Sequence, residues 1–272
     1  MSVVHTRTPL RISLGGGGTD LPSFYSEHGG FVVSAAIDKY VHVVAGTAFR
    51  DRYLLKHLEW EEVDDPAHVR HPILRAALMH HWEGRPLELA SVADAPAGTG
   101  LGSSGSYAVG VLAALARLRG EEPDAAAIAA AACHLEIDLV GRTVGKQDQY
   151  AAAHGGANAW TFGRDGGVSR RALELPAATL EALEENFLLF YTGVKRSASG
   201  ALADQVRRTL AGEADIAANL TRTKEIAVHS CAALEAGDLA GLAPLINEQW
   251  DCKLARVPAM SAGPIPELRD FA

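Results

Sequence analysis

The pattern of hydrophobic and polar positions predicts a chain that mixes strands with helices. Residues 3–14 predict an extended segment, and Pro9 limits it to an edge or irregular strand because proline cannot donate to a central ladder. The run from Gly30 to Gly46 is rich in β-branched residues and is interrupted near Asp38-Lys39, which predicts two strands. Shorter strands are predicted over residues 53–56, 87–92 and 157–162.

Helical periodicity governs much of the remaining sequence. Helices are predicted over residues 72–81, 103–118, 125 to about 140, and 146–154. Asp124 is a favoured N-cap for the third of these, and the Gly141-Arg-Thr-Val-Gly145 run separates it from the fourth.

A change in composition after Pro176 predicts a second domain. Phe187-Leu-Leu-Phe-Tyr-Thr192 predicts a buried strand that opens it, and further helices are predicted at about 199–210, 214–236 and 238–255. We therefore expect an α+β fold in two domains, residues 1–180 and 181–272, with the boundary near 176–186.

Composition narrows the classes of partner. The 272 residues are 48% hydrophobic and carry a net charge of −8 without a basic cluster, which argues against nucleic acid as a partner. No apolar run approaches the length of a membrane span. Three well-separated cysteines, Cys133, Cys231 and Cys252, form no disulfide framework. The sequence therefore predicts a soluble cytoplasmic protein with no membrane partner.

The strongest local signal is a glycine- and serine-rich loop from Asp94 to Ser106. Its glycines and serines are Gly98, Gly100, Gly102, Ser103, Ser104, Gly105 and Ser106. Glycine lets a ligand approach the backbone, and the helix that follows turns its free N–H groups and positive dipole end toward the loop. This pattern predicts a phosphate site. The alternative is an ordinary helix start capped by one serine.

Two carboxylates lie twelve positions apart on either side of the Gly141–Gly145 break. Asp148 follows Lys146 near a predicted helix N-terminus, which suits a base or an electrostatic partner for a substrate hydroxyl. Glu136 is placed so that it can face the phosphate loop and share a Mg²⁺ ion with a serine hydroxyl and phosphate oxygens. The alternative for both residues is an ordinary surface carboxylate.

A second glycine-rich turn follows the first predicted strand. Arg11 precedes this turn and can stabilise charge on a transferring phosphoryl group, whereas Asp20 ends it and can accept hydrogen bonds from sugar hydroxyls. The alternatives are a surface strand residue for Arg11 and a turn-stabilising side chain for Asp20. Lys195 and Arg196 lie between a predicted strand and helix, as a second anion site or as solvated charges.

Together these residues resemble the GHMP small-molecule kinases, named for galactokinase, homoserine kinase, mevalonate kinase and phosphomevalonate kinase. The run Pro96-Ala-Gly-Thr-Gly-Leu-Gly-Ser-Ser-Gly105 is similar to their ATP-phosphate motif. The spacing from Glu136 to Asp148 is similar to that of their metal glutamate and catalytic aspartate. Within the family the sequence looks most like kinases of D-glycero-D-manno-heptose 7-phosphate, in four segments: Arg7–Pro22, His28–Tyr40, Gly145–Tyr150 and Phe190–Gly193.

The resemblance implies an N-terminal half like the ribosomal S5 domain 2 and a C-terminal GHMP half. It implies that Asp148 and Arg11 act on the acceptor hydroxyl and that Ser104 and Glu136 hold Mg²⁺. The residues implied for ATP are Pro96, Gly98, Gly100, Leu101, Gly102, Ser103 and Ser104. Those implied for the sugar are Gly17, Thr19, Asp20, Lys146, Gln147, Thr192, Gly193 and Arg196.

The family's third motif, a glycine-rich strand-loop, has no counterpart before Ala272, so we expect the C-terminal domain to be incomplete. The resulting hypothesis is an ATP- and Mg²⁺-dependent kinase that phosphorylates the anomeric hydroxyl of a heptose 7-phosphate. One alternative is a kinase for an unphosphorylated sugar such as fucose or galactose, which would not need Lys195 and Arg196. Another is a non-catalytic sugar or nucleotide sensor. A homodimer is left open.

Overall fold

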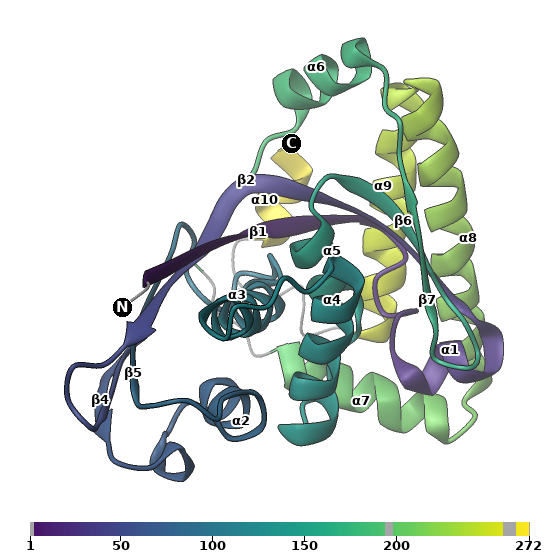
Figure 1. The fold of residues 1–272 in the computed structure, drawn as a ribbon. Coiled ribbons are helices and arrows are strands. Elements are labelled where there is room, and N and C mark those ends of the chain that lie inside the picture. The colour runs from purple at the N-terminus through teal and green to yellow at the C-terminus, as the bar shows by residue number, and fades with distance from the viewer. Residues whose placement is uncertain (1–2, 194–197, 258–264, 272) are drawn as a thin grey trace. The chain divides into compact units, whose positions relative to one another are not determined.

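The computed structural model describes residues 3–193, 198–257 and 265–271, and it is a mixed α and β structure. These residues pack as two compact units (Figure 1). The first unit comprises residues 1–11 and 36–155, and the second comprises residues 12–35 and 156–272. Two long strands, β1 (Val3–Gly15) and β2 (Gly30–Thr47), run from one unit into the other. This discontinuous division differs from the continuous one expected at residue 180, which stays a prediction.

The sheet of the first unit is built on the second half of β2. Its order is β4-β3-β5-β2, where β3 is Tyr53–Lys56, β4 is Trp60–Val63 and β5 is Leu87–Ala93. β2 and β5 are antiparallel, with Val41 opposite Ala93 and Thr47 opposite Leu87. β3 and β5 are parallel, so a crossover connection must join them. That connection contains the 3₁₀ turn η1 (Pro66–His68) and the helix α2 (Pro72–His81).

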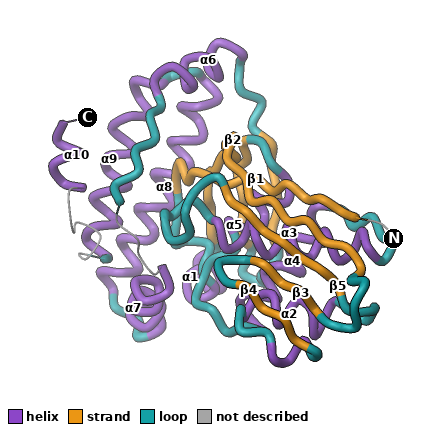
Figure 2. The backbone as a smooth tube through the Cα atoms, turned by 90° about the vertical axis from the view of Figure 1, so that its left-hand side faces the viewer, coloured by secondary structure: helices purple, strands orange, loops and turns teal. Residues whose placement is uncertain are grey.

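Helices cover one face of these strands (Figure 2). They are α2, α3 (Ser103–Leu118), α4 (Ala125–Cys133) and α5 (Gln147–His154). α3 contacts the other three helices, and its apolar residues are buried along most of its length, so it forms the centre of the core. Gly110 of α3 allows the close approach of β1, because a Cβ there would lie 3.1 Å from Thr8 Oγ1.

The helix expected from Ala125 to about Val140 is present, but only its first part is α-helical. Asp124 caps it as predicted, since its Oδ1 accepts hydrogen bonds from the N–H groups of Ala126 and Ala127. After Cys133 the chain continues as the π-helical turn η2 (His134–Leu139). The wider π turn changes the direction of the side chains that follow it, and such turns are frequent at functional sites. Glu136 lies in this turn.

The second unit combines helices with the other end of the same sheet, which has seven strands within the described residues and is antiparallel at this end. The first half of β2 pairs with β6 (Ala157–Phe162), which pairs with β7 (Val168–Ala172). Its helices are α1 (Pro22–His28), α6 (Ala177–Asn186), α7 (Ala198–Leu210), α8 (Ala214–Ala236), α9 (Leu239–Arg256) and α10 (Ile265–Phe271). α8 and α9 pack along each other, and Leu14, Val33 and Leu234 contribute to the core of this unit.

Two predictions of local structure are wrong. The segment from Phe187 to Tyr191 is exposed and forms no strand within the described part of the chain, although its sequence predicts a buried one. An apolar run becomes a strand only when a neighbouring strand supplies its hydrogen bonds. β2 is one strand and is not broken at Asp38-Lys39. Its partner changes there instead, from β6 over residues 30–35 to β5 over residues 41–47.

Candidate active site

The glycine-rich loop joins β5 to the start of α3, in the first unit. Gly98 and Gly100 have φ of +82°, and Gly102, the N-cap residue of α3, is left-handed at +75°. No side chain of the described residues caps α3, so the serine-cap alternative is not what the structure shows. A Cβ at Gly100 would meet no described atom within 4 Å, so this part of the backbone faces open space. The loop therefore offers uncapped N–H groups at a helix N-terminus, which is a favourable place for an anion.

The start of α5 lies directly against this loop. A Cβ at Gly105 would be 2.7 Å from Asp148 Cβ and 3.0 Å from the backbone nitrogen of Gln149. A Cβ at Gly102 would be 3.2 Å from Asp148 Cγ. These glycines therefore have a second role besides loop flexibility, because the absence of a side chain is what allows Asp148 to approach the glycine-rich loop.

Arg11 connects Asp148 to the same loop. Its Nη2 and Nε lie 2.5 and 2.8 Å from Asp148 Oδ1, and its Nη1 donates to the carbonyl oxygen of Gly100 at 2.6 Å. The backbone N–H of Arg11 donates to the carbonyl oxygen of Leu101 at 3.0 Å. The side chain of Asp148 is 26% exposed, so its carboxylate is held in place and still accessible.

Glu136 is the centre of a second group of contacts beside the loop. It is 1% exposed, and its Oε1 accepts hydrogen bonds from the hydroxyl of Ser104 and from Arg142 Nη1, the latter at 2.8 Å. Gln149 Nε2 donates to its Oε2 at 2.7 Å. Burial raises the pKa of Glu136, whereas the hydrogen bond from Ser104 and the charge of Arg142 oppose that shift.

Ser104 and Glu136 are an acceptable partial donor set for Mg²⁺. Both are hard oxygen donors, and they are in direct contact. Among the described residues no group of three or more His, Cys, Asp or Glu side chains could hold a metal ion. A cation here would therefore take the rest of its ligands from phosphate oxygens and water, as is usual for Mg²⁺ bound with a nucleotide.

Two residues of this group, Arg142 and Gln149, are absent from the site expected from the sequence. Gln149 lies in the Gly145–Tyr150 motif, so its position next to Asp148 could have suggested it. Arg142 lies in the glycine-rich break after η2, and only the fold brings its side chain back to Glu136.

The turn expected to hold the sugar belongs to the second unit. Asp20 is 2% exposed, and its Oδ1 accepts a hydrogen bond from the N–H of Gly18 at 3.0 Å, so it has the turn-stabilising role left open by the sequence. Thr19 is also buried, and its hydroxyl donates to the carbonyl oxygens of Gly16 and Phe31. Contact of Gly17, Thr19 or Asp20 with a sugar stays a prediction.

The remaining predicted sugar residues are spread over both units. Lys146 is the N-cap residue of α5 and Gln147 is its first residue, in the first unit. Thr192 and Gly193 lie in the second unit, after the exposed apolar segment. Lys195 and Arg196 lie outside the described residues.

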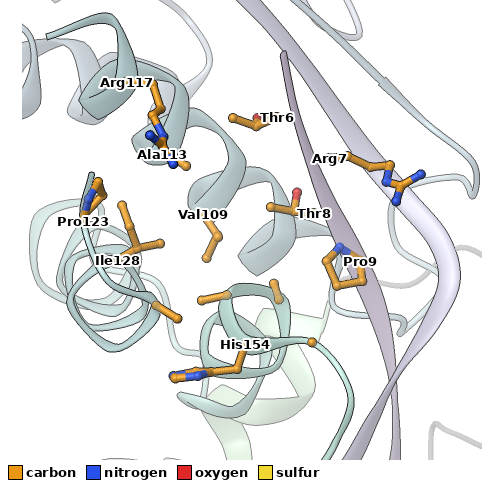
Figure 3. A pocket seen from close by; sticks show the side chains of 14 residues that line it. Thr6, Arg7, Thr8, Pro9, Val109, Ala113, Arg117, Pro123, Ile128 and His154 are labelled. Carbon is orange, nitrogen blue, oxygen red and sulfur yellow. The ribbon is translucent and has the colours of Figure 1, made fainter. Parts of the chain in front are cut away.

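A separate groove of about 390 Å³ lies in the first unit (Figure 3). Its lining includes Thr6, Thr8, Val109, Arg117, Ile128 and His154, from β1, α3, the start of α4 and the end of α5. None of the residues that line it belongs to the site expected from the sequence.

Residues 71–156 match the family described as the GHMP kinases N terminal domain. This part of the chain is therefore similar to the GHMP kinases. The matched segment runs from α2 through the phosphate loop to the end of α5 and so contains Ser104, Glu136 and Asp148. The expected fold and the expected class of enzyme, a phosphotransferase, are confirmed.

The proteins to which this chain is similar include several sugar kinases. It is 28% identical over 266 residues to the D-glycero-alpha-D-manno-heptose 7-phosphate kinase of Campylobacter jejuni, covering 93% of this chain and 78% of that one. It is 26% identical over 289 residues to the L-fucokinase/L-fucose-1-P guanylyltransferase of Bacteroides fragilis, covering 92% of this chain and 30% of that one.

A solved structure shares the fold of this chain. It is a D-glycero-D-manno-heptose 1-phosphate kinase from Bacteroides thetaiotaomicron, with a TM-score of 0.77 at 22% identity. The match covers 97% of this chain and 81% of that one. None of the helices in the described residues is long and apolar enough to cross a membrane.

Proposed function

We propose that this chain is a GHMP kinase that transfers the γ-phosphoryl group of ATP to the anomeric hydroxyl of a heptose 7-phosphate. The observation that carries the proposal is the ion pair between Arg11 and Asp148, held against the phosphate loop by Gly102 and Gly105. A loop that binds only phosphate does not need an accessible carboxylate beside it, whereas transfer to an alcohol does. The heptose 7-phosphate acceptor is supported by the relative from Campylobacter jejuni.

In the proposed reaction the chain contributes mainly positioning and charge. The acceptor oxygen forms a bond to the γ-phosphorus as the bond from that phosphorus to the bridging oxygen breaks. Asp148 orients the acceptor hydroxyl and takes its proton. Arg11 holds the Asp148 carboxylate and adds positive charge beside the transferred group. The backbone N–H groups from Gly98 to Ser104 bind phosphate oxygens.

Mg²⁺ would be held by Ser104 and Glu136, and when bound it would neutralise charge on the β- and γ-phosphates. Glu136 does not act as the base in this scheme. It is 1% exposed and already accepts three hydrogen bonds, so it is placed to bind a cation and not to reach an acceptor.

The proposal is tested by measuring phosphate transfer from ATP to D-glycero-D-manno-heptose 7-phosphate and to the same heptose without its phosphate. We expect transfer to the 7-phosphate at the anomeric position, located by ³¹P NMR of the product. Absence of transfer to any sugar, with ATP bound and the chain folded, would contradict the proposal.

A second candidate is phosphorylation of an unphosphorylated sugar such as fucose. It is supported by the match at 26% identity to the L-fucokinase/L-fucose-1-P guanylyltransferase of Bacteroides fragilis, of which this chain covers 30%. The acceptor of the first candidate carries a phosphate group away from its anomeric hydroxyl, and the acceptor of the second does not. Comparison of kcat/KM for heptose 7-phosphate, heptose and L-fucose decides between them, because a site built for a distal phosphate loses most of its efficiency without it.

A further inference from the structure

Arg142 occupies an unexpected position in the phosphate site. It lies in the turn between η2 and α5, and its backbone N–H donates to the carbonyl oxygen of Glu136 at 2.9 Å. Gly141, with φ of +74°, begins the turn that returns the chain toward η2. The backbone of Arg142 is therefore fixed beside Glu136, and its side chain starts close to this site.

The guanidinium of Arg142 touches both oxygens that are expected to hold Mg²⁺. Its Nη1 contacts Ser104 Oγ and lies 2.8 Å from Glu136 Oε1. Mg²⁺ binds its oxygen ligands at about 2.1 Å. A cation bound to both oxygens would thus occupy the space in which Nη1 lies, so the guanidinium and the cation exclude each other.

Glu136 needs a positive partner because it is 1% exposed. Apart from Arg142, its hydrogen-bond partners among the described side chains are the neutral groups of Ser104 and Gln149. A buried carboxylate with only neutral partners is strongly unfavourable. Arg142 can leave this position more easily than Glu136 can, because its side chain is 30% exposed.

We infer that Arg142 is the resident counter-ion of Glu136 and competes with a divalent cation for Glu136 Oε1 and Ser104 Oγ. The inference rests on the proposed function, since it takes these two oxygens as the metal ligands. Gln149 binds the other carboxylate oxygen, Oε2, and can therefore stay in place when the cation replaces Arg142. Arg142 keeps the buried carboxylate neutralised and raises the concentration of cation needed to fill the site.

The test measures binding of Mn²⁺, used as the probe in place of Mg²⁺, by the EPR signal of free Mn²⁺ in the absence of sugar. Arg142→Gln removes the competing charge and keeps a hydrogen-bond donor, so we expect its Kd for Mn²⁺ to fall about tenfold, which corresponds to about 1.4 kcal/mol. The control is Arg117→Gln, since Arg117 pairs with the exposed Glu122 in another part of the first unit. An unchanged or weaker affinity in a folded Arg142→Gln variant would overturn the inference.

Glu136→Gln separates this inference from the proposed function. If Glu136→Gln binds Mn²⁺ as tightly as the unaltered chain does, the metal site of the proposed function is wrong. If it loses Mn²⁺ while Arg142→Gln binds with unchanged affinity, the metal site stands and only the role of Arg142 is wrong.

A second measurement uses the unaltered chain, in case Arg142→Gln does not fold. Labelling of arginines by phenylglyoxal is quantified by mass spectrometry with and without Mg²⁺. We expect Mg²⁺ to increase labelling of Arg142 severalfold, because its guanidinium leaves Glu136, and to leave labelling of Arg117 unchanged. Equal labelling of Arg142 under both conditions, at a Mg²⁺ concentration that fills the site, would exclude the displacement.

Discussion

Arg11 and Asp148 are 137 positions apart in the sequence, yet two nitrogens of the Arg11 side chain lie within 2.8 Å of one oxygen of Asp148. Arg11 comes from β1 and Asp148 from the first turn of α5. The third nitrogen of the guanidinium binds the carbonyl oxygen of Gly100, so one side chain fixes both the carboxylate and the phosphate loop. The position of Asp148 is therefore set by the loop that would bind the phosphates.

Asp148→Asn tests this arrangement most directly. The amide keeps the size of the side chain but cannot accept the acceptor's proton, so we expect kcat to fall by about 10²- to 10⁴-fold. The affinity for ATP, measured by calorimetry, should change little because in the proposed function the loop backbone, and not Asp148, binds the phosphates. Asp51→Asn is the control, since Asp51 is exposed and lies 3.5 Å from Arg85. A variant of Asp148 with nearly normal kcat would remove Asp148 from the reaction.

Gly105→Ala tests the close approach of α3 and α5. The added Cβ would lie 2.7 Å from Asp148 Cβ and 3.0 Å from the nitrogen of Gln149, so the two helices must separate. We expect the free energy of unfolding in urea to fall by about 1–3 kcal/mol, with a loss of kcat in the fraction that stays folded.

The control for this prediction is Gly200→Ala in α7, where an added Cβ would meet no described atom within 4 Å. Alanine favours a helix over glycine by up to about 1 kcal/mol, so this variant should be as stable as the unaltered chain or more so. A Gly105→Ala variant of equal stability and activity would show that the packing of α3 on α5 is loose.

The glycine-rich loop, Glu136 and Asp148 could be selected as candidate site residues from the sequence because their signals are local. A loop that must bind an anion needs glycines within a few residues of a helix start, and that density is visible in residues 98–105. Asp148 could be proposed as a site residue for a similar reason, since it begins a helix beside Lys146 in an otherwise alanine-rich stretch.

Features that depend on distant partners could not be predicted in this way. The contact of Arg142 with Glu136 depends on the π turn at His134–Leu139. The apolar periodicity of this stretch predicts a continuous helix and does not indicate the π turn. The apolar segment from Phe187 to Tyr191 has the composition of a strand, but its state depends on a pairing partner that no local pattern reports. The continuity of β2 across Asp38-Lys39 likewise depends on its two different partners.

Gln249→Ala tests whether the glycine turn of the second unit binds the acceptor. Gln249 Oε1 accepts a hydrogen bond from the backbone N–H of Gly16 at 2.8 Å, and this bond helps to fix the turn from Gly16 to Asp20. Loss of such a bond costs about 1 kcal/mol, so we expect KM for the acceptor sugar to rise by about fivefold to tenfold. The affinity for ATP should not change.

Asn247→Ala is the matched control, because Asn247 is an exposed amide on the same helix. An equal rise of KM in both variants would indicate a general disturbance of α9. An unchanged KM in Gln249→Ala would place the acceptor away from this turn.

The half-buried imidazole of His71 makes the stability of the first unit sensitive to acid. Burial lowers the pKa of His71 from its ordinary value of 6.5 to about 4, and the nearby charges of His57 and Arg142 act in the same direction, against Glu61. The neutral ring also caps α2, since its Nδ1 accepts a hydrogen bond from the N–H of Leu74 at 3.3 Å. A protonated ring could not accept this bond, so protonation removes the cap.

The folded state therefore binds fewer protons at His71 than the unfolded state does between pH 6.5 and about 4. The stabilisation of the folded state by the neutral His71 ring is fully present above pH 6.5 and is lost as the pH falls toward 4. Between pH 7 and pH 5, the free energy of unfolding in urea should fall by on the order of 1 kcal/mol because of this residue. This value takes into account that the ring is partly exposed to solvent. His71→Asn keeps a capping side chain that does not titrate, so its stability should fall less over this interval. The control is His80→Asn, which alters an exposed histidine of α2 and should leave the pH dependence of the unfolding free energy unchanged. If the unfolding free energies of His71→Asn and of the unaltered chain changed in parallel with pH, the assignment to His71 would be contradicted.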